Sequence, residues 1–193
     1  MACRPNGSPW LSRPAGNAVA GSPVEPVRLA ANEQQAAKPA EAAAPAEAEA
    51  EAVRAVEFDP DHDRGHATLG WALFKQGRTA EGLAELERAV ALAPMSAQWL
   101  AQLGEARALA GDAEAAREIL AELERRAETG FVASYNLAYV HTGLGDHDRA
   151  IDHLERAMEE RTGAVYGLKG SFLLAPLRDH PRFQALLARM NLS

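Results

Sequence analysis

The chain repeats itself every 34 residues. Five columns of apolar or small residues recur at this spacing and share one register. They are Leu69, Leu103 and Leu137; Gly77, Gly111 and Gly145; Leu86, Leu120 and Leu154; Gly82, Ala116 and Ala150; and Ala89, Leu123 and Ala157. A unit of this length that recurs in register predicts a stacked array, in which each unit packs mainly against its neighbours.

Each unit is predicted to be a pair of helices. In the first unit, Leu69 and Leu73 have helical spacing, and Gly77 follows as a helix stop. The apolar stripe of residues 83–92 predicts the second helix, which Pro94 closes. The connection after Gly77 is short, so we expect the two helices to be antiparallel. The small-residue columns suit a close approach of the two helix axes.

This pattern resembles the tetratricopeptide repeat, a family whose period is 34 residues. The residues that carry the resemblance in the first unit are Leu69, Gly70, Leu73, Gly77, Leu86, Ala89 and Pro94. The resemblance covers about residues 48–162. His66 and Leu100 depart from it, because the family often has Trp at these positions, and Glu128 stands where the second unit would end in Pro.

The resemblance implies an all-α, right-handed α-α superhelix of three helix pairs. We assign the pairs to residues 63–96, 97–130 and 131–162. Residues 46–62 then form an acidic half-repeat helix at one end of the array, and residues 163–193 form a cap at the other.

The first 45 residues are predicted to be a disordered leader. They hold seven of the eleven prolines and are otherwise rich in Ala, Gly, Ser and Asn, which is too little apolar surface to offset chain entropy. Pro39 and Pro45 argue against a continuous helix across residues 35–46. We therefore expect the first helix to start at Ala46.

The segment 176–187 predicts the closing helix, with Pro181 in its first turn. It is similar to the end of repeat arrays in bacterial signalling proteins, which include cyclases, kinases and winged-helix regulators. That likeness implies a bacterial origin and the natural end of an array.

Composition excludes several classes of protein. A single cysteine, Cys3, rules out an intrachain disulfide framework. The net charge of −7 has the wrong sign for a protein held on nucleic acid or anionic lipid. The sequence shows no secretory signal and no apolar run of about 20 residues, the length that crosses a membrane. We expect a cytoplasmic protein that contacts neither nucleic acid nor membrane.

The sequence also shows no catalytic or metal-binding pattern. His62 and His66 have the spacing of a helical metal pair, but no third ligand accompanies them. Ser134 and Ser171 have no evident base and orienting acid. His141 is expected to pack, neutral, between helices. We therefore predict a protein without catalytic residues, metal or cofactor.

In the family that the repeats resemble, the inner curve of the array is the usual peptide-binding face. The chain's positions on that face combine aromatic anchors with polar side chains suited to a peptide backbone. The predicted partner-binding residues are Arg64, Thr68, Trp71, Gln98, Gln102, Glu105, Tyr135, Asn136 and Tyr139. The Lys, Asn and Arg set with which some family members bind chaperone tails is missing from the matching positions.

These observations predict a non-catalytic scaffold or adaptor that binds a partner peptide or helix in its concave groove. Two alternatives stay open. One is a sensory or regulatory module detached from a bacterial cyclase, kinase or transcription regulator. The other is a receptor for a small ligand, which would use the aromatic inner wall.

Overall fold

The computed structural model describes residues 39–161 and 168–192, with side chains from residue 46 onward. Most of the predicted leader, residues 1–38, therefore lies outside the described residues. Within the described ranges all regular secondary structure is helical. Its elements are α1 (Pro39–Phe58), α2 (Asp63–Lys75), α3 (Thr79–Leu92), α4 (Ala97–Leu109), α5 (Ala113–Thr129), α6 (Ser134–Gly143), α7 (His147–Glu159), the 3-10 helix η3 (Phe172–Leu177) and α8 (Pro181–Arg189).

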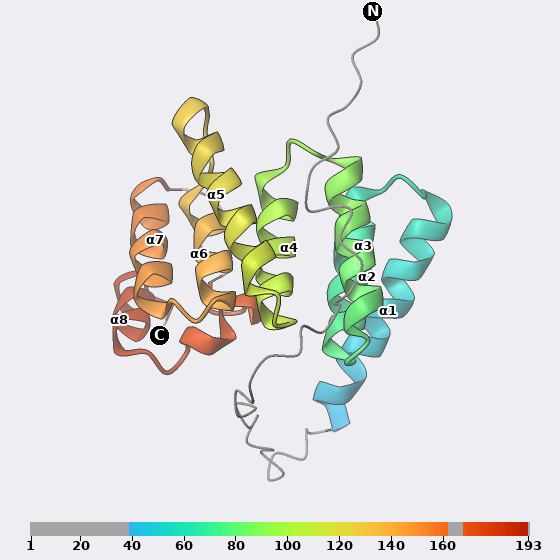
Figure 1. The fold of residues 1–193 in the computed structure, drawn as a ribbon. Helices are drawn as coiled ribbons and strands as arrows, with labels where there is room; N and C mark the ends of the chain where they lie inside the picture. The colour runs from blue at the N-terminus through green and yellow to red at the C-terminus, as the bar shows by residue number, and fades with distance from the viewer. Residues whose placement is uncertain (1–38, 162–167, 193) are drawn as a thin grey trace, which may run out of the picture.

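Consecutive helices form packed pairs, as the repeat predicts. Helix α2 packs on α3, α4 on α5, and α6 on α7, and the pairs follow one another in an array (Figure 1). Helix α4 packs closely along α6, whereas α2 and α4 approach each other less closely. The predicted all-α solenoid is confirmed, and its first two units are the more widely separated neighbours.

The glycine column ends the first helix of every pair. Gly77, Gly111 and Gly145 have φ angles of 79°, 88° and 79°, a left-handed conformation that costs glycine little and other residues more. Gly82 belongs to the small-residue column of the second helices. A Cβ atom there would lie 2.6 Å from the carbonyl oxygen of Gly70. Both columns therefore recur for steric reasons.

Helix α1 corrects one prediction. It begins at Pro39 rather than at Ala46, and its backbone continues through Pro45. Proline is well tolerated in the first turn of a helix, where its missing N–H would have no intrahelical partner. Pro45 lies further inside and removes one backbone hydrogen bond. The alanines and glutamates around it are good helix formers, which offsets that loss.

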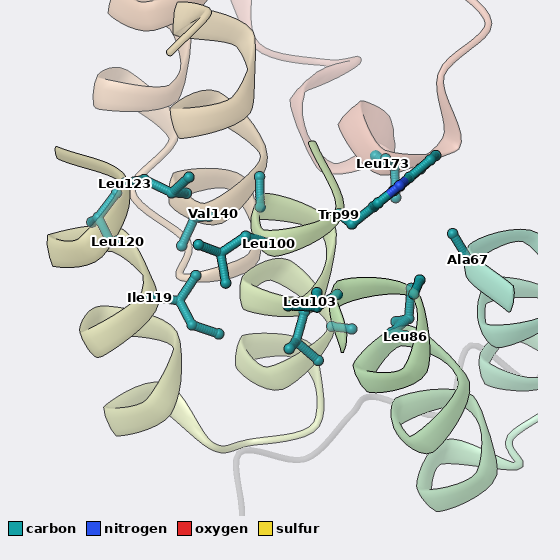
Figure 2. Packing of buried hydrophobic residues seen from close by; sticks show 14 of the residues in the cluster. Ala67, Leu86, Trp99, Leu100, Leu103, Ile119, Leu120, Leu123, Val140 and Leu173 are labelled. Atoms are coloured by element: carbon teal, nitrogen blue, oxygen red, sulfur yellow. The ribbon is translucent and has the colours of Figure 1, made fainter. Parts of the chain in front are cut away.

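The main hydrophobic core runs through the middle of the array. Leu100 and Leu103 of α4 are fully buried, and they pack with residues of α5 and α6 such as Ile119 and Val140 (Figure 2). A second core joins α7, η3 and α8 through Ile151, Leu174 and Phe183, among others. A small cluster between α1 and α2 centres on Ala52.

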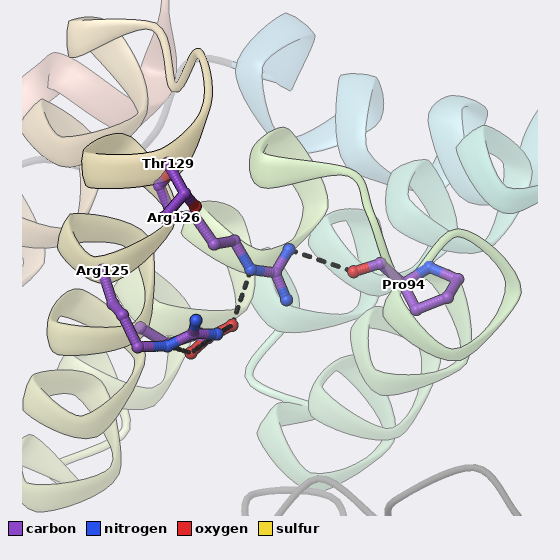
Figure 3. A network of polar contacts seen from close by, with 5 residues as sticks. Pro94, Arg125, Arg126 and Thr129 are labelled. Carbon is purple, nitrogen blue, oxygen red and sulfur yellow. Dashed lines mark hydrogen bonds and ion pairs between the residues drawn. The ribbon is translucent and has the colours of Figure 1, made fainter.

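Polar contacts fix the second pair against the first (Figure 3). Arg126 of α5 donates through Nη1 to the carbonyl oxygen of Pro94, which lies between α3 and α4, at 3.0 Å. The Glu122 carboxylate holds Arg126 in place, at 2.7 Å from its Nε, and also accepts from Arg125 at 2.8 Å. The end of α5 is thereby tied to the preceding inter-helix loop.

The C-terminal segment folds back onto the array. Pro181 stands in the first turn of α8, as predicted, and Phe183, Leu186 and Leu187 form the buried face of that helix. The element η3 was not foreseen. It packs on α6, and its Leu174 and Leu177 are fully buried.

Candidate partner-binding cavity

A cavity of about 500 Å³ lies between α2, α4 and η3. Helix α2 contributes Arg64, Thr68 and Trp71, while α4 contributes Gln98 and Gln102. Phe172 and Leu173 of η3 line a further side, and Ala48 of α1 also borders the cavity. The cavity forms where the first two repeat units are less closely packed, so it follows from the spacing of the array. Its volume falls within the range of about 300–1,000 Å³ typical of ligand sites.

An indole forms the central wall of this cavity. Trp71 is only 7% exposed, and its Nε1 donates a hydrogen bond to Oε1 of Gln102 at 3.0 Å. Two phenyl rings pack edge-on against the indole, Phe74 at 5.4 Å and Phe172 at 5.3 Å between ring centroids. These contacts hold Trp71 in one orientation, so the wall is rigid before any ligand binds.

A second indole borders the cavity from α4. Nε1 of Trp99 donates to Oδ2 of Asp63 at 2.8 Å, and this hydrogen bond lowers the pKa of Asp63. Leu173 of η3 lies beside the Trp99 ring (Figure 2). The Trp99 bond and the Trp71 bond both run between α2 and α4, and they hold the two walls at a set separation.

The cap covers the other half of the inner face. Tyr139 of α6 forms a hydrogen bond with Ser171, just before η3, and burial raises the pKa of its hydroxyl to about 12. Tyr135 packs against the cap core and meets the Tyr139 ring edge-on at 5.8 Å. Both rings therefore pack largely against the chain's own C-terminal segment.

Two polar residues of the inner face are fully enclosed. Glu105 is 1% exposed, its Oε2 has no hydrogen-bond partner within the described ranges, and burial raises the pKa of its carboxyl well above the usual value. Asn136 is also buried, and its Oδ1 is likewise without a described partner. Neither side chain is accessible to a partner in this conformation.

The nine predicted partner-binding residues thus separate into two groups. Five line the cavity, namely Arg64, Thr68, Trp71, Gln98 and Gln102. The other four, Glu105, Tyr135, Asn136 and Tyr139, are not part of its lining. The cap packs on α6, so the nine residues do not share one cavity, and their role in partner binding stays a prediction.

The cavity lining also includes residues outside the predicted nine, among them Trp99, Lys75 and Phe172. Trp99 and Lys75 stand on helices whose register was assigned correctly, so their positions on the inner face could have been found from the repeat. Phe172 had no such signal, because η3 lies outside the 34-residue repeat. Its ring lies beneath the ammonium group of Lys75, which is 3.4 Å from the ring centroid.

His66, one of the two histidines with metal-pair spacing, serves a structural role. Nδ1 of His66 lies 2.6 Å from Oε2 of Glu85, and its Nε2 lies 3.0 Å from the carbonyl oxygen of Pro60, so both ring nitrogens are engaged. Over residues 39–161 and 168–192, no group of three or more His, Cys, Asp or Glu could hold a metal ion. In the same ranges, no helix has both the length and the apolar character needed to cross a membrane.

Comparison with known proteins supports the repeat at one place in the chain. Residues 132–161 match the model of the tetratricopeptide repeat family. This match coincides with the third predicted unit, and the first two units share its helix pairs and its glycine stops. No curated protein matches the sequence. The fold is thus a solenoid of the tetratricopeptide type that contains a recognised repeat.

Proposed function

We propose that this protein is a non-catalytic adaptor of the cytoplasm, and that it binds a segment of a partner protein in the cavity between α2 and α4. Tetratricopeptide repeats typically bind proteins or peptides, and this chain carries one. The single observation that carries the proposal is the Trp71 wall, a rigid aromatic surface beside a space that the cap leaves open. Aromatic anchors of this kind contribute strongly to binding at interfaces.

The polar groups of the cavity suit a peptide backbone. Thr68 is exposed, and its hydroxyl, which donates to the carbonyl oxygen of Arg64 at 2.9 Å, can still accept from a backbone amide. Gln98 is partly exposed. Gln102 already accepts from Trp71 through Oε1, and its amide nitrogen is left to donate. Apolar walls with a few hydrogen-bonding groups are the usual composition of a site that binds a short segment.

Photo-crosslinking in the source cells tests this proposal. A benzophenone amino acid would replace Thr68 in one variant and Ala121 in another. Ala121 is the matched control, because it is exposed on α5 and takes no part in the cavity lining. We expect discrete crosslinked proteins from position 68 and none of the same mass from position 121. Equal crosslinking at both positions, or none at position 68, would contradict the proposal.

The volume of the cavity also favours a second candidate, a receptor for a small organic ligand. About 500 Å³ is large enough for such a molecule. Native mass spectrometry of the protein purified from its source separates the two. A fixed added mass of a few hundred daltons that the Thr68→Trp variant lacks would favour the receptor, whereas crosslinked protein at position 68 favours the adaptor.

A further inference from the structure

The charge of the cavity indicates what kind of segment fits it. Arg64 and Lys75 belong to its lining, whereas none of the described residues that line it is acidic. The chain as a whole has 27 acidic and 20 basic residues, so this local excess of positive charge runs against the average. A protein segment that enters the cavity therefore meets cations in a molecule that otherwise repels acidic partners.

Neither cation has a carboxylate partner at ion-pair distance among the residues that the structure describes. Both residues are exposed, and neither makes an ion pair within the described ranges. The nearest carboxylate in sequence, that of Asp63, accepts from Nε1 of Trp99 and from the backbone N–H of Arg64. The other two arginines of the first unit, residues 63–96, do make ion pairs. Arg78 pairs with Glu49 and Glu81, and Arg88 pairs with Asp61.

The two cations have a definite spacing. Arg64 and Lys75 are eleven residues apart on α2, which is about three helical turns, so they lie on one face of the helix. At about 1.5 Å per residue their backbones are about 16 Å apart. Trp71 and Thr68 lie between them on the same wall. An extended peptide covers this distance in about five residues.

Resting on the function proposed above, we infer that the partner segment is acidic, with an apolar side chain against Trp71 and Phe172 and a carboxylate on either side of it, toward Arg64 and toward Lys75. The apolar side chain packs against the aromatic wall, and the carboxylates supply the counter-charges that the described lining of the cavity lacks. Lys75 is held over the Phe172 ring, so its ammonium is already positioned for one of them. These cations stand at the two ends of α2, not at the family's chaperone-tail positions, which Ala67, Trp71, Val132 and Asn136 occupy here.

Selection from a random peptide library displayed on phage tests this inference on the full chain. The wild type should enrich peptides that combine Asp or Glu with an aromatic or aliphatic residue. The double variant Arg64→Glu, Lys75→Glu should lose these peptides and enrich basic ones. The matched control is Arg117→Glu, Arg156→Glu, which changes the charge equally at exposed positions on α5 and α7. It should enrich the same acidic peptides as the wild type.

Milder variants keep the test valid if the charge reversal disturbs folding. Arg64→Gln and Lys75→Met retain most of each side chain. Each should weaken an enriched acidic peptide about threefold to tenfold at low salt, and the loss should shrink as salt screens the charges. Fluorescence anisotropy of the labelled peptide measures these changes.

The outcomes separate this inference from the proposed function. If the wild type enriches neutral or basic peptides that the Thr68→Trp variant no longer binds, the cavity is the site but the acidic character is wrong. If the enriched peptides bind Thr68→Trp as well as the wild type, or if no peptide is enriched, both the inference and the proposed function fail. Acidic peptides that depend on Thr68, Arg64 and Lys75 support both.

Discussion

The hydrogen bond from Nε1 of Trp71 to Oε1 of Gln102, at 3.0 Å, joins the first helix of one repeat unit to the first helix of the next. Both side chains are more than nine-tenths buried. The bond satisfies two polar groups that would otherwise be enclosed without a partner. It also sets the wall of the cavity, so the same contact serves packing and the proposed binding site.

Loss of this bond should destabilise the array. Trp71→Phe removes the donor and leaves the Gln102 carbonyl buried without its partner, which should lower the free energy of unfolding by about 1–3 kcal/mol. Urea denaturation followed by circular dichroism measures the change. In a double-mutant cycle with Gln102→Leu, the combined loss should be smaller than the sum of the single losses. Strict additivity would show that the two side chains do not interact.

The central core should be sensitive to a cavity. Leu103 is fully buried between its neighbours, so Leu103→Ala should cost about 2–5 kcal/mol. Since repeats stabilise one another, the whole array should melt earlier rather than one pair alone. Leu109→Ala is the matched control, because Leu109 is 50% exposed at the end of α4. It should change stability by no more than about 0.5 kcal/mol, and equal losses in the two variants would contradict the assigned register.

The buried carboxyl of Glu105 should make the protein less stable as the pH rises. Burial raises the pKa of Glu105 well above 4.5, so the folded chain keeps a proton that the unfolded chain releases. Above pH 4.5 unfolding is therefore coupled to proton release, and stability falls until the pH exceeds the folded pKa. Tyr139 is the titratable group that couples to this carboxyl. Glu105→Gln should raise the melting temperature at pH 7 and remove this component of the pH dependence. A lower melting temperature at pH 7 would show that the carboxylate is stabilised by contacts other than those described.

The stacked histidines of α6 and α7 should make the protein less stable as the pH falls, which is the opposite of the effect of Glu105. The rings of His141 and His153 lie 5.2 Å apart at 15°, and burial is the main reason that the pKa of His153 falls to about 4. The unfolded chain takes up a proton near pH 6.5 and the folded chain near pH 4. The contribution of neutral His153 to the free energy of unfolding is therefore fully present above pH 6.5. It is lost as the pH falls toward 4.

Thermal melts of wild type and His153→Gln between pH 7 and 4 measure this loss. After allowance for the partial exposure of the ring, the wild type should lose about 1–2 kcal/mol more than the variant over this range. His147→Gln, outside the stacked pair, is the control and should follow the wild type. Parallel curves for wild type and His153→Gln would contradict the assignment.

The parts of the fold that the repeat governs could be predicted from the sequence. Gly77 and Pro181 each stand at a helix end because their backbone conformation suits that place, and both signals are local. The start of α1 at Pro39 could not be read in the same way, since it depends on how helix formers offset a proline within one helix. The position of η3 also could not be predicted from the sequence, because its packing on α6 joins segments far apart in the sequence.

In the candidate site, too, the repeat predicts some residues and tertiary packing determines others. Thr68 and Gln102 were predicted because they occupy the same position in successive units, 34 residues apart. The closure of the face over Tyr139 depends on a tertiary contact with Ser171, for which no repeat spacing exists. Periodicity therefore predicts which residues face inward, but tertiary packing decides which of them remain accessible.

Calorimetric titration of the segment crosslinked at position 68 tests the central claim most directly. Thr68→Trp places a large side chain in the cavity, whereas Ala121→Trp adds the same side chain at an exposed site on α5. Circular dichroism would first establish that both variants keep their helix content. The account predicts that Thr68→Trp weakens binding at least thirtyfold, about 2 kcal/mol, and that Ala121→Trp leaves the dissociation constant unchanged. Unchanged binding by Thr68→Trp, or equal losses in both variants, would show that the partner binds elsewhere.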